Sequence, residues 1–203
     1  MTQMKFLALG DSYTIGEAVA QDERWPVQLV EALRKRQIYF ADPEIIATTG
    51  WRTDELSQAI SERRAAPDYD MVSLLIGVNN LYQGRSLDEY AKEFEALLIS
   101  AIKLAKSNRR NVFVLSIPDY GYTPFGKDKQ EEISRATDSF NEVNRRLTLS
   151  HGVSYFDITG VSRDGLKKPE LIASDNLHPS GLMYSEWVRI ILASDSTPFS
   201  SFL

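Results

Sequence analysis

Short apolar runs alternate with longer amphipathic segments along the whole chain. The runs occupy residues 4–9, 44–47, 71–76, 112–117 and 153–156. Each run is almost continuously hydrophobic instead of alternating between apolar and polar positions, which is typical of strands buried on both faces of a sheet. The pattern therefore predicts five strands in the interior of the protein.

The segments between and after these runs repeat their apolar residues at helical spacing. The apolar stripes lie in residues 25–33, 53–64, 86–101, 133–147 and 183–191. A capping box at residues 86–89 predicts the start of the third helix, and Ser180 is the expected N-cap of the last one. We therefore predict five helices that each bury one face.

Strands that alternate with helices predict a parallel sheet covered by helices on both faces. The connections between strands are expected to be right-handed crossovers. The chain has 203 residues and shows no internal repeat, low-complexity tract or linker, so we predict one domain over residues 1–203. Residues 194–203, which include Pro198 and several serines, are expected to form an irregular extension.

Composition and charge exclude several classes of protein. The chain is 43% hydrophobic and 25% charged, as in ordinary globular proteins, and its net charge of −5 disfavours binding to nucleic acid. It contains no cysteine, which excludes disulfides, thiol catalysis and thiolate metal sites. No apolar stretch approaches the roughly 20 residues of a membrane span, so stable membrane insertion is not expected.

The N-terminal segment bears on localisation. Its apolar run is too short for the core of a signal peptide, and no cleavage-type sequence follows it. We therefore expect a cytoplasmic protein, and an exported form whose signal has been removed is the alternative. The sequence carries no signal for an oligomeric state.

Small and polar residues follow three of the predicted strands and precede the last predicted helix. Ser12 follows the first strand, Gly50 the second and Asn79 the third, and Asp175 and His178 lie before the last helix. Ligands bind at the carboxyl edge of open α/β sheets, so we expect these residues to lie together there. A serine needs an adjacent base to act as a nucleophile, and His178 is the candidate base.

These residue types suit an acyl-transfer reaction. We predict that His178 takes the proton of Ser12 as a base and returns it to the leaving group as an acid. Asp175 is expected to accept a hydrogen bond from the other imidazole nitrogen and to fix the tautomer. The backbone N–H groups of Ser12 and Gly50 and the side-chain amide of Asn79 are three donors for the negative charge of the tetrahedral intermediate.

The same residues resemble the four ordered sequence blocks of the SGNH (GDSL-type) hydrolases. The blocks are Gly10-Asp11-Ser12, Gly50, Gly77-Val78-Asn79 and Asp175-Asn176-Leu177-His178-Pro179. The resemblance implies a three-layer α/β/α fold with a five-stranded, flavodoxin-like parallel sheet in the order 2-1-3-4-5. It also implies Ser12 as nucleophile, Asp175 and His178 as its partners, and Ser12, Gly50 and Asn79 as the oxyanion hole.

Two positions depart from the pattern of these blocks. The leucine of the block that gives the family its name is Tyr13 here, a change that we expect to be harmless. The aspartate that usually follows the asparagine of the third block is replaced by Asn80 here. We expect this change to alter the local hydrogen bonds but not the role of Asn79 as a donor.

Each of these residues also has a structural interpretation when it is taken alone. A serine after a strand is usually a loop or cap residue, and glycine, asparagine and aspartate are common in turns. The only other histidine, His151, follows a predicted helix and is most simply a C-terminal helix residue. The occurrence of all four blocks in order favours the catalytic interpretation.

Residues 121–128 have the G-x-x-x-x-G-K spacing of a phosphate-binding loop. The position after the lysine is Asp128 and not serine or threonine, so no hydroxyl is available for magnesium and a negative charge faces the phosphate. Pro124 also removes one of the N–H donors on which such a loop depends. Nucleotide binding is therefore disfavoured, and we interpret the loop as part of the rim of a pocket.

Aromatic and basic residues at the same sheet edge are candidates for substrate binding. The aromatic candidates for an acyl or sugar subsite are Trp51, Tyr82 and Tyr122, with Tyr120 and Phe125 beside them. The alternative is that these rings simply cover the end of the core. Arg52 and Arg85 are candidate contacts for an anionic head group.

The sequence thus predicts a serine esterase or acylhydrolase that needs no cofactor. Its substrate is expected to be a small-molecule or lipid ester, such as a lysophospholipid, a short-chain acyl ester or an acetyl ester. The same triad fits an acyltransferase if an alcohol outcompetes water, and a ligand-binding module with a decayed site is a further alternative. The residues do not distinguish among these esters, because substrate choice lies in the loops.

Overall fold

Five parallel strands form a single sheet at the centre of the computed structural model, which describes residues 3–193. The strands are β1 (Phe6–Gly10), β2 (Glu44–Ala47), β3 (Met71–Leu75), β4 (Val112–Leu115) and β5 (Ser154–Phe156). Their order across the sheet is β2-β1-β3-β4-β5. The predicted strands and the order 2-1-3-4-5 are confirmed.

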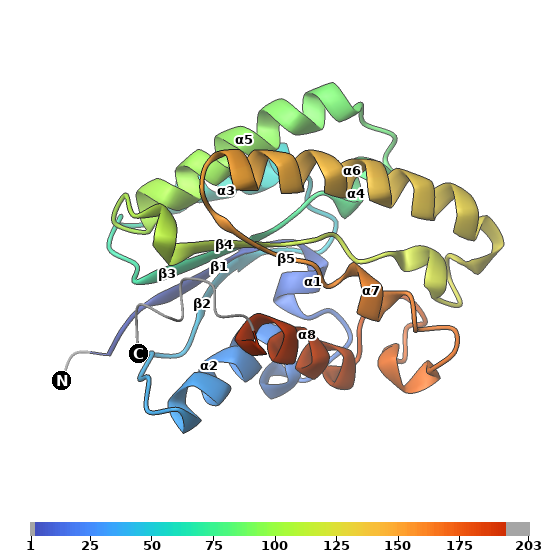
Figure 1. Ribbon diagram of the computed structural model, residues 1–203, viewed down its shortest axis with the longest axis horizontal. Coiled ribbons are helices and arrows are strands. Elements are labelled where there is room, and N and C mark those ends of the chain that lie inside the picture. The colour runs from blue at the N-terminus through green and yellow to red at the C-terminus, as the bar shows by residue number, and fades with distance from the viewer. Residues whose placement is uncertain (1–2, 194–203) are drawn as a thin grey trace.

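Helices cover both faces of the sheet (Figure 1). On one face α2 (Trp25–Lys35) packs against α8 (Gly181–Ala193). On the other face lie α3 (Thr53–Arg63), α5 (Leu87–Leu104) and α6 (Gln130–Ser150). The five helices predicted from apolar spacing and the three-layer α/β/α fold are therefore present, and the extension expected at residues 194–203 lies outside the described residues.

Shorter helical segments connect these elements. Apolar spacing does not predict the short α-helices, which are α1 (Ser12–Ile15), α4 (Val78–Tyr82) and α7 (Thr159–Ser162). The 3₁₀ turns are η1 (Gln21–Glu23), η2 (Arg109–Asn111), η3 (Tyr120–Tyr122), η4 (Lys127–Lys129) and η5 (Pro169–Leu171). Each segment is too short for an apolar stripe to repeat, so its sequence looks like that of a loop.

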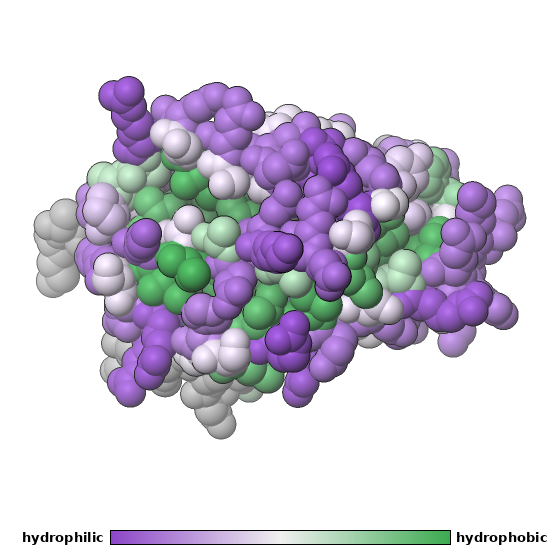
Figure 2. Space-filling view, turned by 90° about the horizontal axis from the view of Figure 1, so that it is seen from above, coloured by the Kyte–Doolittle hydropathy of each residue, from purple (hydrophilic) through white to green (hydrophobic). Residues whose placement is uncertain are grey.

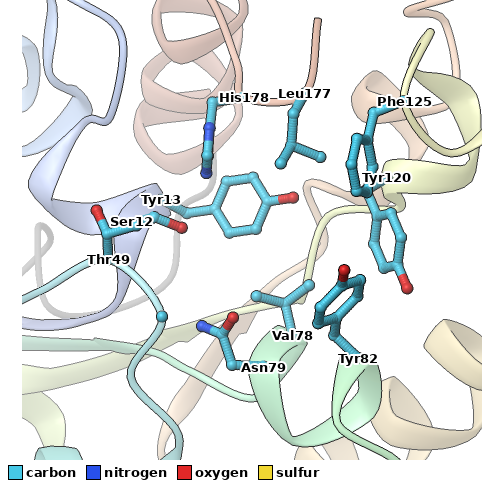
Figure 3. A pocket seen from close by; sticks show the side chains of 11 residues that line it. Ser12, Tyr13, Thr49, Val78, Asn79, Tyr82, Tyr120, Phe125, Leu177 and His178 are labelled. Atoms are coloured by element: carbon cyan, nitrogen blue, oxygen red, sulfur yellow. The ribbon is translucent and has the colours of Figure 1, made fainter. Parts of the chain in front are cut away.

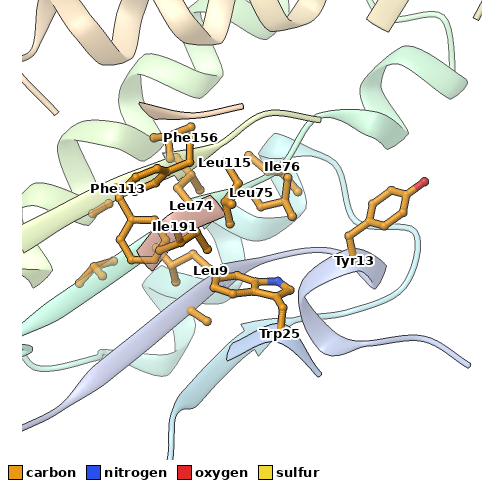
Figure 4. Close-up of a cluster of buried hydrophobic side chains, with 14 of the residues drawn as sticks. Leu9, Tyr13, Trp25, Leu74, Leu75, Ile76, Phe113, Leu115, Phe156 and Ile191 are labelled. Carbon is orange, nitrogen blue, oxygen red and sulfur yellow. The ribbon is translucent and has the colours of Figure 1, made fainter. Parts of the chain in front are cut away.

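The core lies between the sheet and its two helical layers (Figure 4). Every residue of β1, β3 and β4 is buried, as expected for strands covered on both faces. Trp25 of α2 meets Phe113 of β4 edge to face, with ring centroids 6.3 Å apart. Phe113 in turn contacts Phe156 of β5 at 5.6 Å, so aromatic packing joins one helical layer to two strands.

The helical layers turn polar side chains outward. Seen from the side of α5 and α6, the surface is largely hydrophilic, with hydrophobic areas between the polar side chains (Figure 2). Within residues 3–193, no helix is both long and apolar enough to cross a membrane.

The three strands on the β2 side of the sheet end at the same level. Gly10, the last residue of β1, is paired with Ala47 of β2 on one side and with Leu75 of β3 on the other. The segments that follow these strands therefore leave the sheet side by side. This register brings together three of the blocks that were expected to share a site.

Candidate active site

A cavity of about 200 Å³ opens at this edge of the sheet (Figure 3). Its lining residues are Ser12, Tyr13, Thr49, Gly50, Val78, Asn79, Tyr82, Tyr120, Phe125, Leu177 and His178. Four of the five residues expected to form the site therefore line one cavity, and the fifth, Asp175, contacts the ring of His178.

Ser12 is the first residue of α1, which begins just after β1. The side chain of Asp11 caps this helix, because its Oδ1 accepts a hydrogen bond from the N–H of Tyr13 at 3.0 Å. Gly10 permits the close turn, since a Cβ at this position would overlap the side chain of Thr14. The serine is thus fixed between a strand and a capped helix, and it is only 4% exposed.

Asp11 is an enclosed carboxyl group next to the nucleophile candidate. Burial raises the pKa of Asp11 to about 7, although the N–H groups of Tyr13 and of Asp11 itself lower it. The folded chain therefore keeps a proton on Asp11 over a pH range in which an unfolded aspartate is ionised. The stability that this proton contributes is lost as the pH rises through about 7.

Asp175 and His178 form a hydrogen-bonded pair in the loop before α8. Asp175 Oδ2 lies 2.5 Å from His178 Nδ1, and Oδ1 accepts from the N–H groups of Leu177 at 3.0 Å and His178 at 2.9 Å. Burial raises the pKa of Asp175, but the hydrogen bonds from His178 and Leu177 outweigh it and bring the pKa below its usual value. An ionised carboxylate only accepts hydrogen bonds, so Nδ1 carries the hydrogen and Nε2 keeps a lone pair.

The ring of His178 extends into the cavity, toward the side on which Ser12 lies (Figure 3). Within the part of the chain that the structure describes, no hydrogen bond joins the Ser12 hydroxyl to this ring. In unliganded enzymes the bond between a nucleophile and its base is often long, and it shortens when the substrate binds. The arrangement is therefore compatible with proton transfer from Ser12 to His178.

Three hydrogen-bond donors border the same space. The backbone N–H groups of Ser12 and Gly50 have no acceptor among residues 3–193. Asn79 lies in α4, and its Nδ2 donates one hydrogen to the carbonyl oxygen of Trp51 at 2.9 Å, which leaves its second hydrogen available. The bond to Trp51 also fixes the amide against the loop that carries Gly50. The geometry thus offers two backbone donors and one side-chain donor to a developing oxyanion.

Asn80 joins two loops of the site. It is 1% exposed, its Oδ1 accepts from the N–H of Thr53 at 3.1 Å, and its Nδ2 donates to Thr53 Oγ1 at 2.6 Å. Thr53, the first residue of α3, in turn donates its hydroxyl hydrogen to Glu93 of α5. An asparagine at this position therefore supports the loop of Asn79 through both ends of its amide.

Comparison with known proteins assigns the chain to a family. The model of the GDSL-like lipase/acylhydrolase family matches residues 8–185, a range that includes all four sequence blocks. The chain belongs to the GDSL-like lipase/acylhydrolase family. The resemblance to the SGNH (GDSL-type) hydrolases is thereby confirmed. No curated protein sequence matches the chain.

Solved structures share the fold of this chain at low sequence identity. The lipase Lip_vut3 from a goat rumen metagenome has a TM-score of 0.78 at 18% identity, over 97% of this chain and 99% of that one. The acetylxylan esterase Axe2 from Geobacillus stearothermophilus has a TM-score of 0.71 at 20% identity, with 95% and 94% covered. The lipase/acylhydrolase from Enterococcus faecalis has a TM-score of 0.71 at 16% identity, with 94% of both chains covered.

Aromatic rings form one wall of the cavity. The rings of Tyr82, Tyr120 and Phe125 lie with their centroids 6.2 to 6.5 Å apart. Two other rings that were expected to bind substrate, Trp51 and Tyr122, do not line the cavity. Trp51 borders a separate groove beside β2, and Tyr122 is two positions beyond Tyr120 in a 3₁₀ turn, where neighbouring side chains point in different directions.

Other candidates from the sequence also lie outside the cavity. Arg52 and Arg85 do not line it, and each pairs with a nearby carboxylate, at 2.9 and 2.8 Å. His151 is the C-cap of α6, and its Nε2 lies 2.8 Å from Glu95 of α5. These three side chains therefore have structural partners, and His178 is the histidine of the site.

The loop at residues 121–128 is held by its own hydrogen bonds. Hydrogen-bond acceptors within the protein bind four N–H groups of the loop, those of Gly121, Thr123, Phe125 and Gly126. The N–H of Phe125 donates to the carbonyl oxygen of Asn176 at 3.1 Å, which ties this loop to the segment of Asp175 and His178. A phosphate cradle needs free N–H groups, so this loop supports the cavity wall instead.

Removing the side-chain amide of Asn79 tests its predicted role as an oxyanion donor. Asn79→Ala is expected to lower kcat about 100- to 1,000-fold with little change in KM if the amide acts as the predicted oxyanion donor, because such a donor stabilises charge that develops only in the transition state. Steady-state hydrolysis of p-nitrophenyl acetate measures both constants. Gln83→Ala is the matched control, since Gln83 binds Arg52 and does not line the cavity. A wild-type kcat in Asn79→Ala would exclude the amide as a donor.

Proposed function

We propose that this GDSL-like acylhydrolase cleaves a carboxylic ester through an acyl-Ser12 intermediate. The observation that carries the proposal is the pair of Asp175 and His178. Their contact of 2.5 Å fixes Nδ1 as the donor and leaves Nε2 as a base in the cavity that Ser12 also lines. The donors at Ser12, Gly50 and Asn79 border the same space, which is the arrangement that acyl transfer requires.

In the proposed first half-reaction, Ser12 Oγ attacks the ester carbonyl carbon while His178 Nε2 takes the hydroxyl proton. The carbonyl oxygen becomes an oxyanion and accepts hydrogen bonds from the N–H groups of Ser12 and Gly50 and from the Asn79 amide. The intermediate collapses as His178 gives its proton to the leaving alcohol. Asp175 stays ionised throughout and stabilises the imidazolium that forms between these steps.

In the second half-reaction, water replaces the alcohol. His178 takes a proton from the water as its oxygen attacks the acyl carbon, and the same three donors hold the second oxyanion. Collapse of this intermediate breaks the bond to Ser12 Oγ, which recovers its proton from His178. The products are a carboxylic acid and the free enzyme.

The size of the cavity supports a short substrate group. An apolar cavity of about 150 Å³ is large enough to hold benzene. The cavity of about 200 Å³ therefore has room for a short acyl group. An acetylxylan esterase is among the proteins with this fold, which agrees with an acyl group as small as acetyl.

Labelling with a fluorophosphonate tests whether Ser12 is activated. The reagent is expected to form a single adduct on wild-type protein, seen by intact mass and assigned to Ser12 by peptide mapping. Ser12→Ala should form no adduct, whereas Ser185→Ala should label like the wild type, because Ser185 lies on α8 outside the cavity. A folded wild-type protein that forms no adduct would contradict the proposal and would favour a ligand-binding module.

A further inference from the structure

Tyr13 occupies a wall of the cavity directly beside the nucleophile candidate. The residue is 3% exposed, and its ring packs edge to face on His178, with centroids 5.5 Å apart. Trp187 of α8 lies on it as well, at 6.4 Å. The N–H of Tyr13 is bonded to Asp11, so both the backbone and the ring are fixed before any substrate arrives.

The hydroxyl of Tyr13 is directed into the cavity (Figure 3). Among residues 3–193, no atom forms a hydrogen bond with it. Burial raises the pKa of Tyr13 well above its ordinary value, and the charge of Asp11 adds to this effect. The hydroxyl therefore keeps its hydrogen at all pH values of interest and can act as a hydrogen-bond donor.

On the side away from Ser12, the cavity is lined by the apolar side chains of Val78, Leu177 and Phe125 and by the rings of Tyr82 and Tyr120. Within residues 3–193, neither tyrosine hydroxyl forms a hydrogen bond with that of Tyr13. A purely alkyl group that filled this space would separate the hydroxyl from water without giving it a partner, and leaving a polar group unpaired costs binding free energy. A substrate group with an oxygen at this point would avoid that cost.

We infer that Tyr13 is a specificity-determining residue, whose hydroxyl donates a hydrogen bond to an ether, hydroxyl or carbonyl oxygen on the substrate group that fills the cavity. The inference rests on the proposed ester hydrolysis and deepens it. The preferred substrate is then an ester with a short, oxygen-bearing group, and a plain alkyl ester of the same length is a poorer one. The tyrosine that replaces the leucine of the name-giving block thus selects substrates.

Two pairs of isosteric esters test this inference. p-Nitrophenyl methoxyacetate and p-nitrophenyl butyrate differ by an oxygen in place of a methylene in the acyl group. Methoxyethyl acetate and butyl acetate differ in the same way in the alcohol. The ratio of kcat/KM within each pair, compared between wild type and Tyr13→Phe, cancels the intrinsic reactivity of the esters.

Tyr13→Phe is expected to lower kcat/KM about 3- to 10-fold for the oxygen-bearing ester of one pair, and to leave or raise it for the alkyl ester. The affected pair shows whether the acyl group or the alcohol reaches Tyr13. Tyr184→Phe is the matched control, because the Tyr184 hydroxyl is also buried and has no hydrogen-bond partner among the described residues, but it does not line the cavity. It should change neither ratio.

The outcomes separate this inference from the proposed function. Turnover of the esters by the wild type with the same ratios in Tyr13→Phe would overturn the role of Tyr13 alone. No turnover of any of the four esters, together with no fluorophosphonate adduct on Ser12, would overturn the proposed function and the inference with it. Thermal unfolding of both variants shows that the comparison is made between folded proteins.

Discussion

Ser12→Ala is expected to lower kcat/KM for p-nitrophenyl acetate by at least about 10⁴-fold, because the proposed mechanism depends on the Ser12 oxygen as the attacking atom. Residual turnover above that of water alone should persist, since the oxyanion donors and the binding surface remain. The side chain of Ser12 makes no hydrogen bond within residues 3–193, so removal of its oxygen should leave the fold almost unchanged.

The mutation therefore separates chemistry from stability. Thermal unfolding of Ser12→Ala should match that of the wild type within a few degrees. Activity should stay at the wild-type level in Ser185→Ala, which removes a surface hydroxyl. If Ser12→Ala retained more than a small fraction of wild-type kcat/KM, the acyl-serine mechanism would be wrong, whatever the labelling experiment showed.

Asp175→Asn is expected to lower kcat about 10³- to 10⁴-fold, because it changes the tautomer of His178 and does not remove the attacking group. The amide has the shape of the carboxylate, so its oxygen can still accept from the N–H groups of Leu177 and His178. Its nitrogen, however, takes the place of Oδ2, which accepts a hydrogen bond from His178 Nδ1 in the wild type. An amide nitrogen can only donate a hydrogen bond at this point. The imidazole then places its hydrogen on Nε2, and the base that faces Ser12 is lost.

A matched control and a pH series make this test specific. Asp164→Asn removes a surface carboxylate that pairs with Lys168, and it should leave kcat unchanged. The folded pKa of Asp175 lies below the unfolded value, so its ionised form contributes stability at neutral pH that is lost as the pH falls through the folded pKa. The stability of Asp175→Asn should therefore not show this loss as the pH falls. Full activity in this variant would show that Asp175 does not set the tautomer.

The strands and the long helices could be predicted from the sequence because burial requires a run or a periodic stripe of apolar residues along the whole element. Four of the five residues of β3 are apolar, with Ser73 as the exception, and the stripe of α6 repeats over several turns. The short helices α1 and α4 show no apolar stripe, since four or five residues complete little more than one turn. Their caps and turns depend on contacts such as that of Gly10 with Thr14, which come from the folded chain.

Every residue of the site that a sequence block suggested lines the cavity or contacts a residue that does, whereas position alone suggested some rings that line it, such as Tyr82, and others that do not. Ser12, Gly50, Asn79 and His178 line one cavity, as expected from their places at the strand ends. Trp51 was expected there because it follows Gly50, but adjacent residues in a loop point to different sides. The supporting bonds of Asn80 to Thr53 link positions that are distant in sequence, so no local pattern reveals them.

The proposed roles of Ser12 and His178 have a consequence for how the chain would acquire activity. Ser12 follows the first strand, whereas His178 lies just before the last helix, so the proposed mechanism requires these distant segments to meet before an ester can be cleaved. Contacts between such distant segments carry a large loop-closure entropy and form late in folding. During refolding, the return of catalytic turnover should therefore mark the docking of α8 and lag behind the formation of helical structure.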